Sequence, residues 1–335
     1  MTPDLKCGNP ISGIKDSKEL TLLDKKGEIK YQETTEKIAG VSLMEKISEL
    51  WSTDAEKMFF ISYLKTVLPD KLFYKLDDVY YAYIPKVLNS RNQTLQSRNA
   101  LIGFYTEKWC RDLFAPIARK MNLYAVNGVV CEELGLTKNS SADLAFCTNE
   151  KKYQNAEAIK LIFEIKMSIV WNYIYNGKKE IKVLGDFRTH KGNPSLLRSD
   201  SMLKAIGKAI NIRVSSFSAN KIPIIIIGNS PITSTYLSKV DYLKSAGVVQ
   251  GFWSLNPYPS DADDYIKNSP LLGFKTYNNI AGISKDCEKL VTNEYYFIST
   301  MLSKPQIGKC ISIAAKEKTN TAKAEKFIEL LKGEL

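Results

Sequence analysis

Residues 141–170 read SADLAFCTNEKKYQNAEAIKLIFEIKMSIV, two apolar segments joined by a polar one. The first segment carries Asp143, and the second, from Ile159 to Met167, carries Glu164 and Lys166. Side chains along a strand alternate between its faces, so we expect Glu164 and Lys166 on one face, roughly 6–7 Å apart along the backbone. A charged group in an apolar strand is costly unless it is paired or binds a metal. The stretch therefore predicts two strands that carry a functional site.

Two carboxylates and a lysine suit the metal-assisted hydrolysis of a phosphodiester. A phosphodiester is anionic and has a poor leaving group, and a bound Mg²⁺ ion helps by screening charge and by lowering the pKa of a bound water. We expect Asp143 and Glu164 to bind the ion, and Lys166 to contact the attacking water and the scissile phosphate. The alternative is an ordinary edge strand on which Glu164 and Lys166 form a cross-strand ion pair.

The sequence around this stretch predicts an α/β (α+β) fold with a central mixed sheet flanked by helices. Apolar residues at helical spacing predict a long helix over 96–121, which Pro116 should kink or end. We divide the chain into a helical N-terminal region (1–95), a core (96–255) and a C-terminal extension (256–335). The other expected elements are helices over 43–68, over 200–216, ending near 243 and over 321–331, strands over 124–131, 141–147, 158–170, 222–228 and 248–253, and a polar, glycine-containing stretch over 172–194.

The helix predicted over 200–216 has two distinct faces. Asp200 is its expected N-cap, because a short carboxylate there can accept hydrogen bonds from the first amides of the helix. Lys204 and Lys208 recur at i, i+4 and should reach phosphate groups while an apolar face packs on the sheet. The expected buried stripe consists of Leu203, Ile206, Ile210 and Val214.

Composition narrows the function further. The 335 residues carry 47 basic and 36 acidic side chains, and this net charge of +11 favours a polyanionic partner. Eleven basic and three acidic residues lie between Lys166 and Lys221, so most of the excess follows the candidate site. The six cysteines have no paired spacing, which is typical of reduced thiols. His190 is the only histidine, which excludes His-rich zinc enzymes and ββα-metal nucleases.

The two candidate strands resemble the PD-(D/E)XK nuclease superfamily, and within it the type II restriction endonucleases. Asp143 stands at the family's first acidic position and Glu164-Ile165-Lys166 at its E-x-K triplet, while Ala142 replaces the family's proline. The same triplet occurs at 28–30 and 180–182, but only the one at 164–166 lies in a long apolar run that follows an acid-bearing strand. The resemblance covers residues 96–253.

The resemblance implies a restriction-endonuclease-like core with a Mg²⁺ ion bound by Asp143, Glu164 and the backbone carbonyl of Ile165. It also implies a further acidic residue on the helix that precedes the site. The candidate is Glu107, and its rivals are Glu132 and Glu133.

We therefore expect a Mg²⁺-dependent, site-specific endodeoxyribonuclease that cleaves double-stranded DNA, acts as a cytoplasmic homodimer, and uses neither a membrane nor a nucleotide cofactor. Two alternatives stay open: a repair, junction or transposon-end nuclease with the same site, and a non-catalytic DNA-binding protein on the same fold. DNA contacts are expected from the basic segment that follows the site. They are Lys178, Lys179, Arg188, His190, Lys191, Arg198, Lys204 and Lys208.

Overall fold

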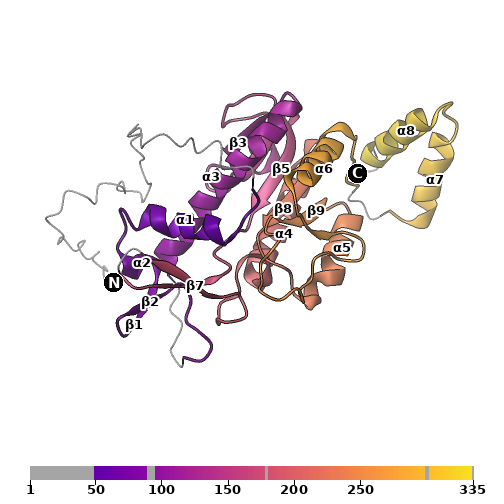
Figure 1. Cartoon of the computed structure of the whole chain (residues 1–335). Helices are drawn as coiled ribbons and strands as arrows, with labels where there is room; N and C mark the ends of the chain where they lie inside the picture. The colour runs from indigo at the N-terminus through magenta and orange to yellow at the C-terminus, as the bar shows by residue number, and fades with distance from the viewer. Residues whose placement is uncertain (1–48, 89–94, 178–179, 299–301, 334–335) are drawn as a thin grey trace, which may run out of the picture. The chain divides into compact units, whose positions relative to one another are not determined.

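A six-stranded mixed sheet forms the centre of the fold, as the computed structural model of the chain shows (Figure 1). The structure describes residues 49–88, 95–177, 180–298 and 302–333, which belong to one compact unit. The strand order is β10-β9-β8-β5-β4-β3; β3, β4 and β5 pair antiparallel, and β5, β8, β9 and β10 pair parallel. The strands are β3 (Tyr124–Val129), β4 (Ala142–Cys147), β5 (Ile159–Ile165), β8 (Ile224–Gly228), β9 (Gly251–Ser254) and β10 (Phe274–Thr276).

Apolar patterning accounts for the central strands. The strand β8 reads IIIIG and is buried at every position, as expected for a parallel strand with both faces covered. Its neighbour β5 is buried at every position except Lys160 and lies between β4 and β8. The alternative in which Glu164 sits on an ordinary edge strand is therefore wrong.

Helices cover both faces of this sheet, so the predicted fold class is confirmed. On one face, α3 (Gln96–Lys120) and α6 (Ile280–Thr292) share a core with inward-facing residues such as Phe163. On the other face, α4 (Ser199–Ser215) and α5 (Leu237–Ser245) share a core with residues such as Ile162. The domain boundaries predicted at 95/96 and 255/256 stay predictions.

The structure contains a second, smaller sheet, which was not predicted from the sequence. Its order is β1-β2-β6-β7 and all its pairs are antiparallel. Two of its strands fall in the stretch 172–194, which was expected to be polar, yet Tyr173 and Tyr175 are buried. The other two fall in the N-terminal region 1–95, so the expectation that this region is helical is wrong there. The strands are β1 (Tyr74–Leu76), β2 (Val79–Tyr81), β6 (Asn172–Tyr175) and β7 (Ile181–Gly185).

A buried carboxylate ties the N-terminal helix α1 (Thr53–Tyr63) to the chain between the two sheets. Glu56 accepts hydrogen bonds from the Trp51 indole at 3.0 Å and the Tyr173 hydroxyl at 3.1 Å. It also accepts bonds from the backbone amides of Val170 and Trp171, at 2.8 and 3.1 Å. Burial raises the pKa of Glu56 to about 7, against the opposing effect of these four donors. The chain that leaves β5 is thereby fixed from this side.

Several element boundaries differ from the prediction. Within the described residues α1 begins at Thr53, because the Ser52 side chain caps it by accepting a bond from the Ala55 amide at 3.4 Å. The residues 43–48 of the predicted helix lie outside the described part of the chain. Pro69 does not end α1 but begins the short helix α2 (Pro69–Leu72), a position where its missing N–H costs nothing.

The other differences involve α3 and β5. Pro116 lies inside α3, whose buried side chains continue past it to Ile117 and Ala118, so packing on the sheet holds the helix across the proline. The strand β5 ends at Ile165 and not near Val170, because the backbone amides after it donate to different parts of the chain. The amide of Lys166 still donates to Ile227 O at 2.7 Å, whereas that of Val170 donates to Glu56.

The C-terminal region contains two helices that pack against each other. The helix α7 (Lys304–Ala314) begins with a capping box made by Ser303 and Gln306. The helix α8 (Asn320–Gly333) contains the predicted helix 321–331. Among the described residues, no helix is both long enough and apolar enough to cross a membrane.

Candidate active site

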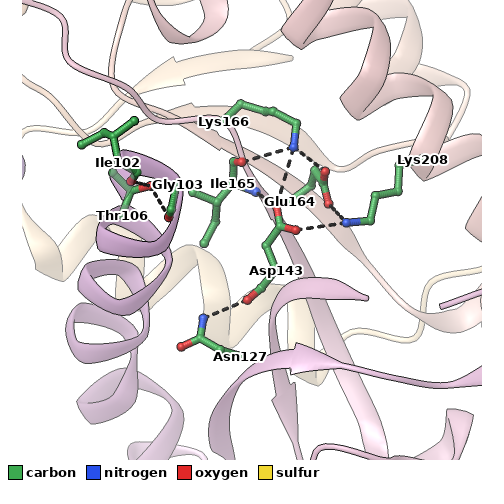
Figure 2. Close-up of polar contacts among 9 residues, drawn as sticks. All are labelled: Ile102, Gly103, Thr106, Asn127, Asp143, Glu164, Ile165, Lys166 and Lys208. Atoms are coloured by element: carbon green, nitrogen blue, oxygen red, sulfur yellow. Dashed lines mark hydrogen bonds and ion pairs between the residues drawn. The ribbon is translucent and has the colours of Figure 1, made fainter. Parts of the chain in front are cut away.

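Two carboxylates meet at one end of the large sheet. The antiparallel register pairs Leu144 on β4 with Phe163 on β5, which places Asp143 directly opposite Glu164. Directly opposed residues of an antiparallel pair point to the same face. The sequence therefore brings both acids to one point of the sheet, beside α3 (Figure 2).

Backbone contacts fix Asp143 in this position. Its Oδ2 accepts a hydrogen bond from the Ile165 amide at 2.7 Å, so β4 and β5 are joined through the site itself. The Asn127 side-chain amide donates to Asp143 O at 2.8 Å (Figure 2). It also donates to Glu107 O at 3.1 Å, which links β3, β4 and α3. The next residue, Gly128, has a φ of 63°, a left-handed conformation that favours glycine.

Lys166 lies one residue past the end of β5 and turns back onto the site. Its Nζ is 2.5 Å from Glu164 Oε1, 3.7 Å from Asp143 Oδ2 and 3.3 Å from Ile165 O. The expectation that Glu164 and Lys166 point the same way is confirmed.

A second lysine enters the site from α4. Lys208 Nζ lies 2.5 Å from Glu164 Oε2 and 3.1 Å from Asp143 Oδ1, and its side chain is only 17% exposed. Figure 2 shows the two ammonium groups on either side of the carboxylate pair. The expectation that Lys208 lies on a face of α4 distinct from the one that packs on the sheet is wrong, because the rotation of α4 points it towards the carboxylates. Its predicted contact with a phosphate stays a prediction.

The four charges balance one another in a largely buried place. Burial and the charge of Asp143 raise the pKa of Glu164, while Lys166 and Lys208 lower it. Burial lowers the pKa of Lys208, but the two carboxylates outweigh that effect and raise it overall. On α3, burial and the Asp143 charge raise the pKa of Glu107 to about 7, so the predicted additional acid lies within electrostatic reach of the site.

The oxygen atoms at this point fit a divalent, oxygen-preferring ion. Mg²⁺ is usually bound by one or two carboxylates and completes its shell with water and substrate phosphate. Asp143, Glu164 and the Ile165 carbonyl offer that donor set. No cluster of three or more acidic, histidine or cysteine side chains that could hold a metal occurs in the described ranges, so water and substrate would supply the other ligands.

His190 is not a surface residue, contrary to the expectation that it contacts DNA. It is 1% exposed, its ring stacks on Tyr83 with centroids 4.0 Å apart, and Nε2 lies 3.2 Å from Val170 O. Burial lowers its pKa to about 4, so the buried ring is neutral at neutral pH. It holds the second sheet against the chain that follows Lys166.

Three of the six other expected DNA contacts form ion pairs. Arg188 pairs with Asp186 at 2.8 Å and also with Asp264. Arg198 and Lys204 both pair with Asp200, at 3.4 and 3.1 Å. Lys191 is exposed. Lys178 and Lys179 lie outside the described residues.

The face of α4 that packs on the sheet is not the one expected. Its buried side chains are Met202, Ala205, Ala209, Ile212 and Arg213. Leu203, Ile210 and Val214 are 62%, 44% and 68% exposed, so the predicted stripe points largely to solvent. Lys208 lies on this side of the helix, three residues after Ala205 and four before Ile212, which brings it to the carboxylates. Asp200 is not the N-cap; that position is Arg198, which makes no side-chain cap.

One further residue of the site was not recognised in the sequence. Asn229 directly follows the buried strand β8, and its side chain binds both backbone groups of Ser168, two residues after Lys166. Its Oδ1 accepts from Ser168 N at 3.1 Å, and its Nδ2 donates to Ser168 O at 2.7 Å. A polar side chain at the carboxyl end of a parallel strand was the available indication in the sequence.

Neither the known family models, nor curated proteins, nor solved structures match this chain.

Proposed function

We propose that this protein is a Mg²⁺-dependent endodeoxyribonuclease that hydrolyses phosphodiester bonds in double-stranded DNA. The observation that carries the proposal is the opposition of Asp143 and Glu164 on neighbouring strands, with Lys166 bonded to both Glu164 and the Ile165 carbonyl. Carboxylates that sit this close in a largely buried place are costly unless cations hold them together. The net charge of +11 favours a polyanionic substrate.

Each side chain has a role that follows from its position. When bound, a Mg²⁺ ion supplies charge neutralisation at the phosphate and lowers the pKa of a bound water. Asp143, Glu164 and the Ile165 carbonyl would hold it, and the hydrogen bond from the Ile165 amide orients Asp143 for that purpose. Lys166, 3.3 Å from the same carbonyl, is placed to contact a scissile phosphate oxygen and to orient the attacking water.

Site-specific cleavage, a homodimeric state and a cytoplasmic location belong to the same proposal. They are supported by the resemblance of the Asp143 and Glu164-Ile165-Lys166 pattern to type II restriction endonucleases.

A supercoiled plasmid incubated with the full-length protein tests the proposal. Discrete fragments with Mg²⁺, and none with EDTA, are the expected result. Smearing, or nicking at DNA structures, would contradict site-specific cleavage and indicate a repair, junction or transposon-end nuclease. Intact plasmid with a retained gel shift would contradict the nuclease activity and indicate a non-catalytic DNA-binding protein.

A further inference from the structure

The cations expected to contact DNA leave few free charges near the site. His190 and Lys208 are buried or turned inward, and Arg188, Arg198 and Lys204 face carboxylates. Among the described candidates only Lys191 is exposed without such a partner, so other parts of the chain would have to extend a surface that guides DNA to Asp143.

The loop 148–155 brings a lysine to the end of the sheet where Asp143 lies. This loop runs beside the end of β3, because Val130 N donates to Lys152 O at 2.9 Å and Gln154 N donates to Val130 O at 2.9 Å. A Cβ built on Gly128 would lie 3.6 Å from Lys152 Nζ and 3.8 Å from Ser141 Oγ. Ser141 is two residues before Asp143 and directly precedes β4.

An aromatic ring and a second lysine continue this surface. Tyr153, next to Lys152, is 59% exposed, a large apolar area to leave in water. Lys138, from the connection between β3 and β4, holds its Nζ 5.9 Å from the centre of the Tyr153 ring. Neither Lys138 nor Lys152 forms an ion pair with a carboxylate within the described parts of the chain.

We propose that Lys138, Lys152 and Tyr153, here called the loop patch, bind the phosphate backbone of duplex DNA next to the scissile bond. The inference rests on the proposed function. Two exposed lysines without carboxylate partners supply contacts for two phosphates, and the Tyr153 ring beside Lys138 packs on a sugar of the duplex. The patch adjoins Ser141 and Gly128, which flank Asp143 along and across the hairpin. DNA held there places a phosphate over the carboxylate pair.

The test measures binding of a fluorescent duplex to the full-length protein in EDTA, where cleavage cannot proceed, at several salt concentrations. The double variant Lys138→Gln/Lys152→Gln should reduce the slope of log affinity against log salt by about 1.8, since each lost phosphate contact accounts for about 0.9. The matched control is Lys160→Gln/Lys285→Gln, which removes the same charge. Lys160 is exposed at the opposite end of β5 from Glu164, and Lys285 is exposed on α6. The control slope should stay close to that of the unmodified protein.

Tyr153→Ala should weaken binding about tenfold, and Tyr153→Phe should bind as the unmodified protein does. Equal slopes in the two double variants, or full binding by Tyr153→Ala, would overturn the loop patch and identify an ordinary surface contact between a lysine and a tyrosine. Because this assay needs no cleavage, loss of the patch in a protein that still cuts plasmid removes only this inference. A protein that binds through the patch but does not cut removes only the nuclease.

Discussion

Glu164 lies between two ammonium groups, each 2.5 Å from one of its oxygens, and this arrangement makes Lys208 the informative residue. Without Lys208, Asp143 and Glu164 repel each other with one lysine left to balance them. We expect Lys208→Met to lower the stability of the metal-free protein by about 1–3 kcal/mol, less than for a fully buried pair because Lys166 remains. Mg²⁺ should then raise the melting temperature more in this variant than in the unmodified protein.

Thermal unfolding in EDTA and in Mg²⁺ measures this difference. Lys204→Met is the matched control, because Lys204 is on the same helix but pairs with the exposed Asp200. The same Mg²⁺ shift in Lys208→Met and in the unmodified protein would mean that the ion does not bind between the two carboxylates.

His190 provides a residue-scale prediction on pH. Its pKa in the folded protein is about 4, below the reference value near 6.5, so the unfolded chain takes up the proton first as the pH falls. The contribution of His190 to the free energy of unfolding is therefore fully present above pH 6.5. It is lost as the pH falls from 6.5 to 4, on the order of 3 kcal/mol in all.

We expect His190→Phe, which keeps a flat ring against Tyr83, to lack this part of the acid sensitivity. Urea unfolding at pH 7 and pH 4.5 should show a smaller loss of stability in His190→Phe than in the unmodified protein. An equal loss of unfolding free energy in both proteins would show that the buried His190 ring does not cause this acid sensitivity.

At the scale of elements, the end of β5 is held by the strand beside it. Asn229 replaces a ladder pair by bonding both backbone groups of Ser168, so it keeps the chain after Lys166 in place. We expect Asn229→Ala to destabilise the fold by roughly 2 kcal/mol, because two half-buried backbone groups of Ser168 lose their partners. Cleavage per folded molecule should also fall, because Lys166 is no longer fixed over the carboxylates.

Urea unfolding and a plasmid assay at matched folded concentration separate these two effects. Asn211→Ala, at an exposed position of α4, is the control and should change neither quantity. Unchanged cleavage per folded molecule in Asn229→Ala would restrict this residue to a structural role.

The orientation of α4 can be tested with two neighbouring residues. Met202 is fully buried and Leu203 is 62% exposed. We expect Met202→Ala to cost about 2–4 kcal/mol of unfolding free energy and Leu203→Ala to change it by less than about 0.5 kcal/mol. Chemical denaturation measures both, and the reverse order would restore the face predicted from the sequence.

The error on α4 has a physical origin. Two stripes of this helix are apolar, and the sequence favours the one with the larger side chains, Leu203, Ile210 and Val214. In the structure the stripe with Ala205 and Ala209 is buried against the sheet instead, because small side chains allow close packing of a helix on a sheet. Helix spacing predicts that a helix forms, but not which of two similar faces it buries. The position of Lys208 depends on that choice.

At the scale of the whole molecule, local patterns predicted five of the six strands of the large sheet, all except β10. Asp143 and Glu164 lie on strands that neighbour each other in sequence, and Lys166 directly follows the second strand, so their meeting follows from one hairpin register. The second sheet could not be predicted in this way. It pairs Tyr80 with Tyr175 and is anchored by Glu56, contacts that join segments about a hundred residues apart. Its strands of three to five residues are too short to show a period in the sequence.

The carboxylate pair is the centre of this account, and an isosteric change at Glu164 tests it most directly. Glu164→Gln keeps the size of the side chain but removes the charge that would hold Mg²⁺. With Mg²⁺ and a supercoiled plasmid, we expect this variant to bind DNA as the unmodified protein does and to leave the plasmid intact. Cleavage by Glu164→Gln at the unmodified rate would contradict a metal-dependent site at Asp143 and Glu164.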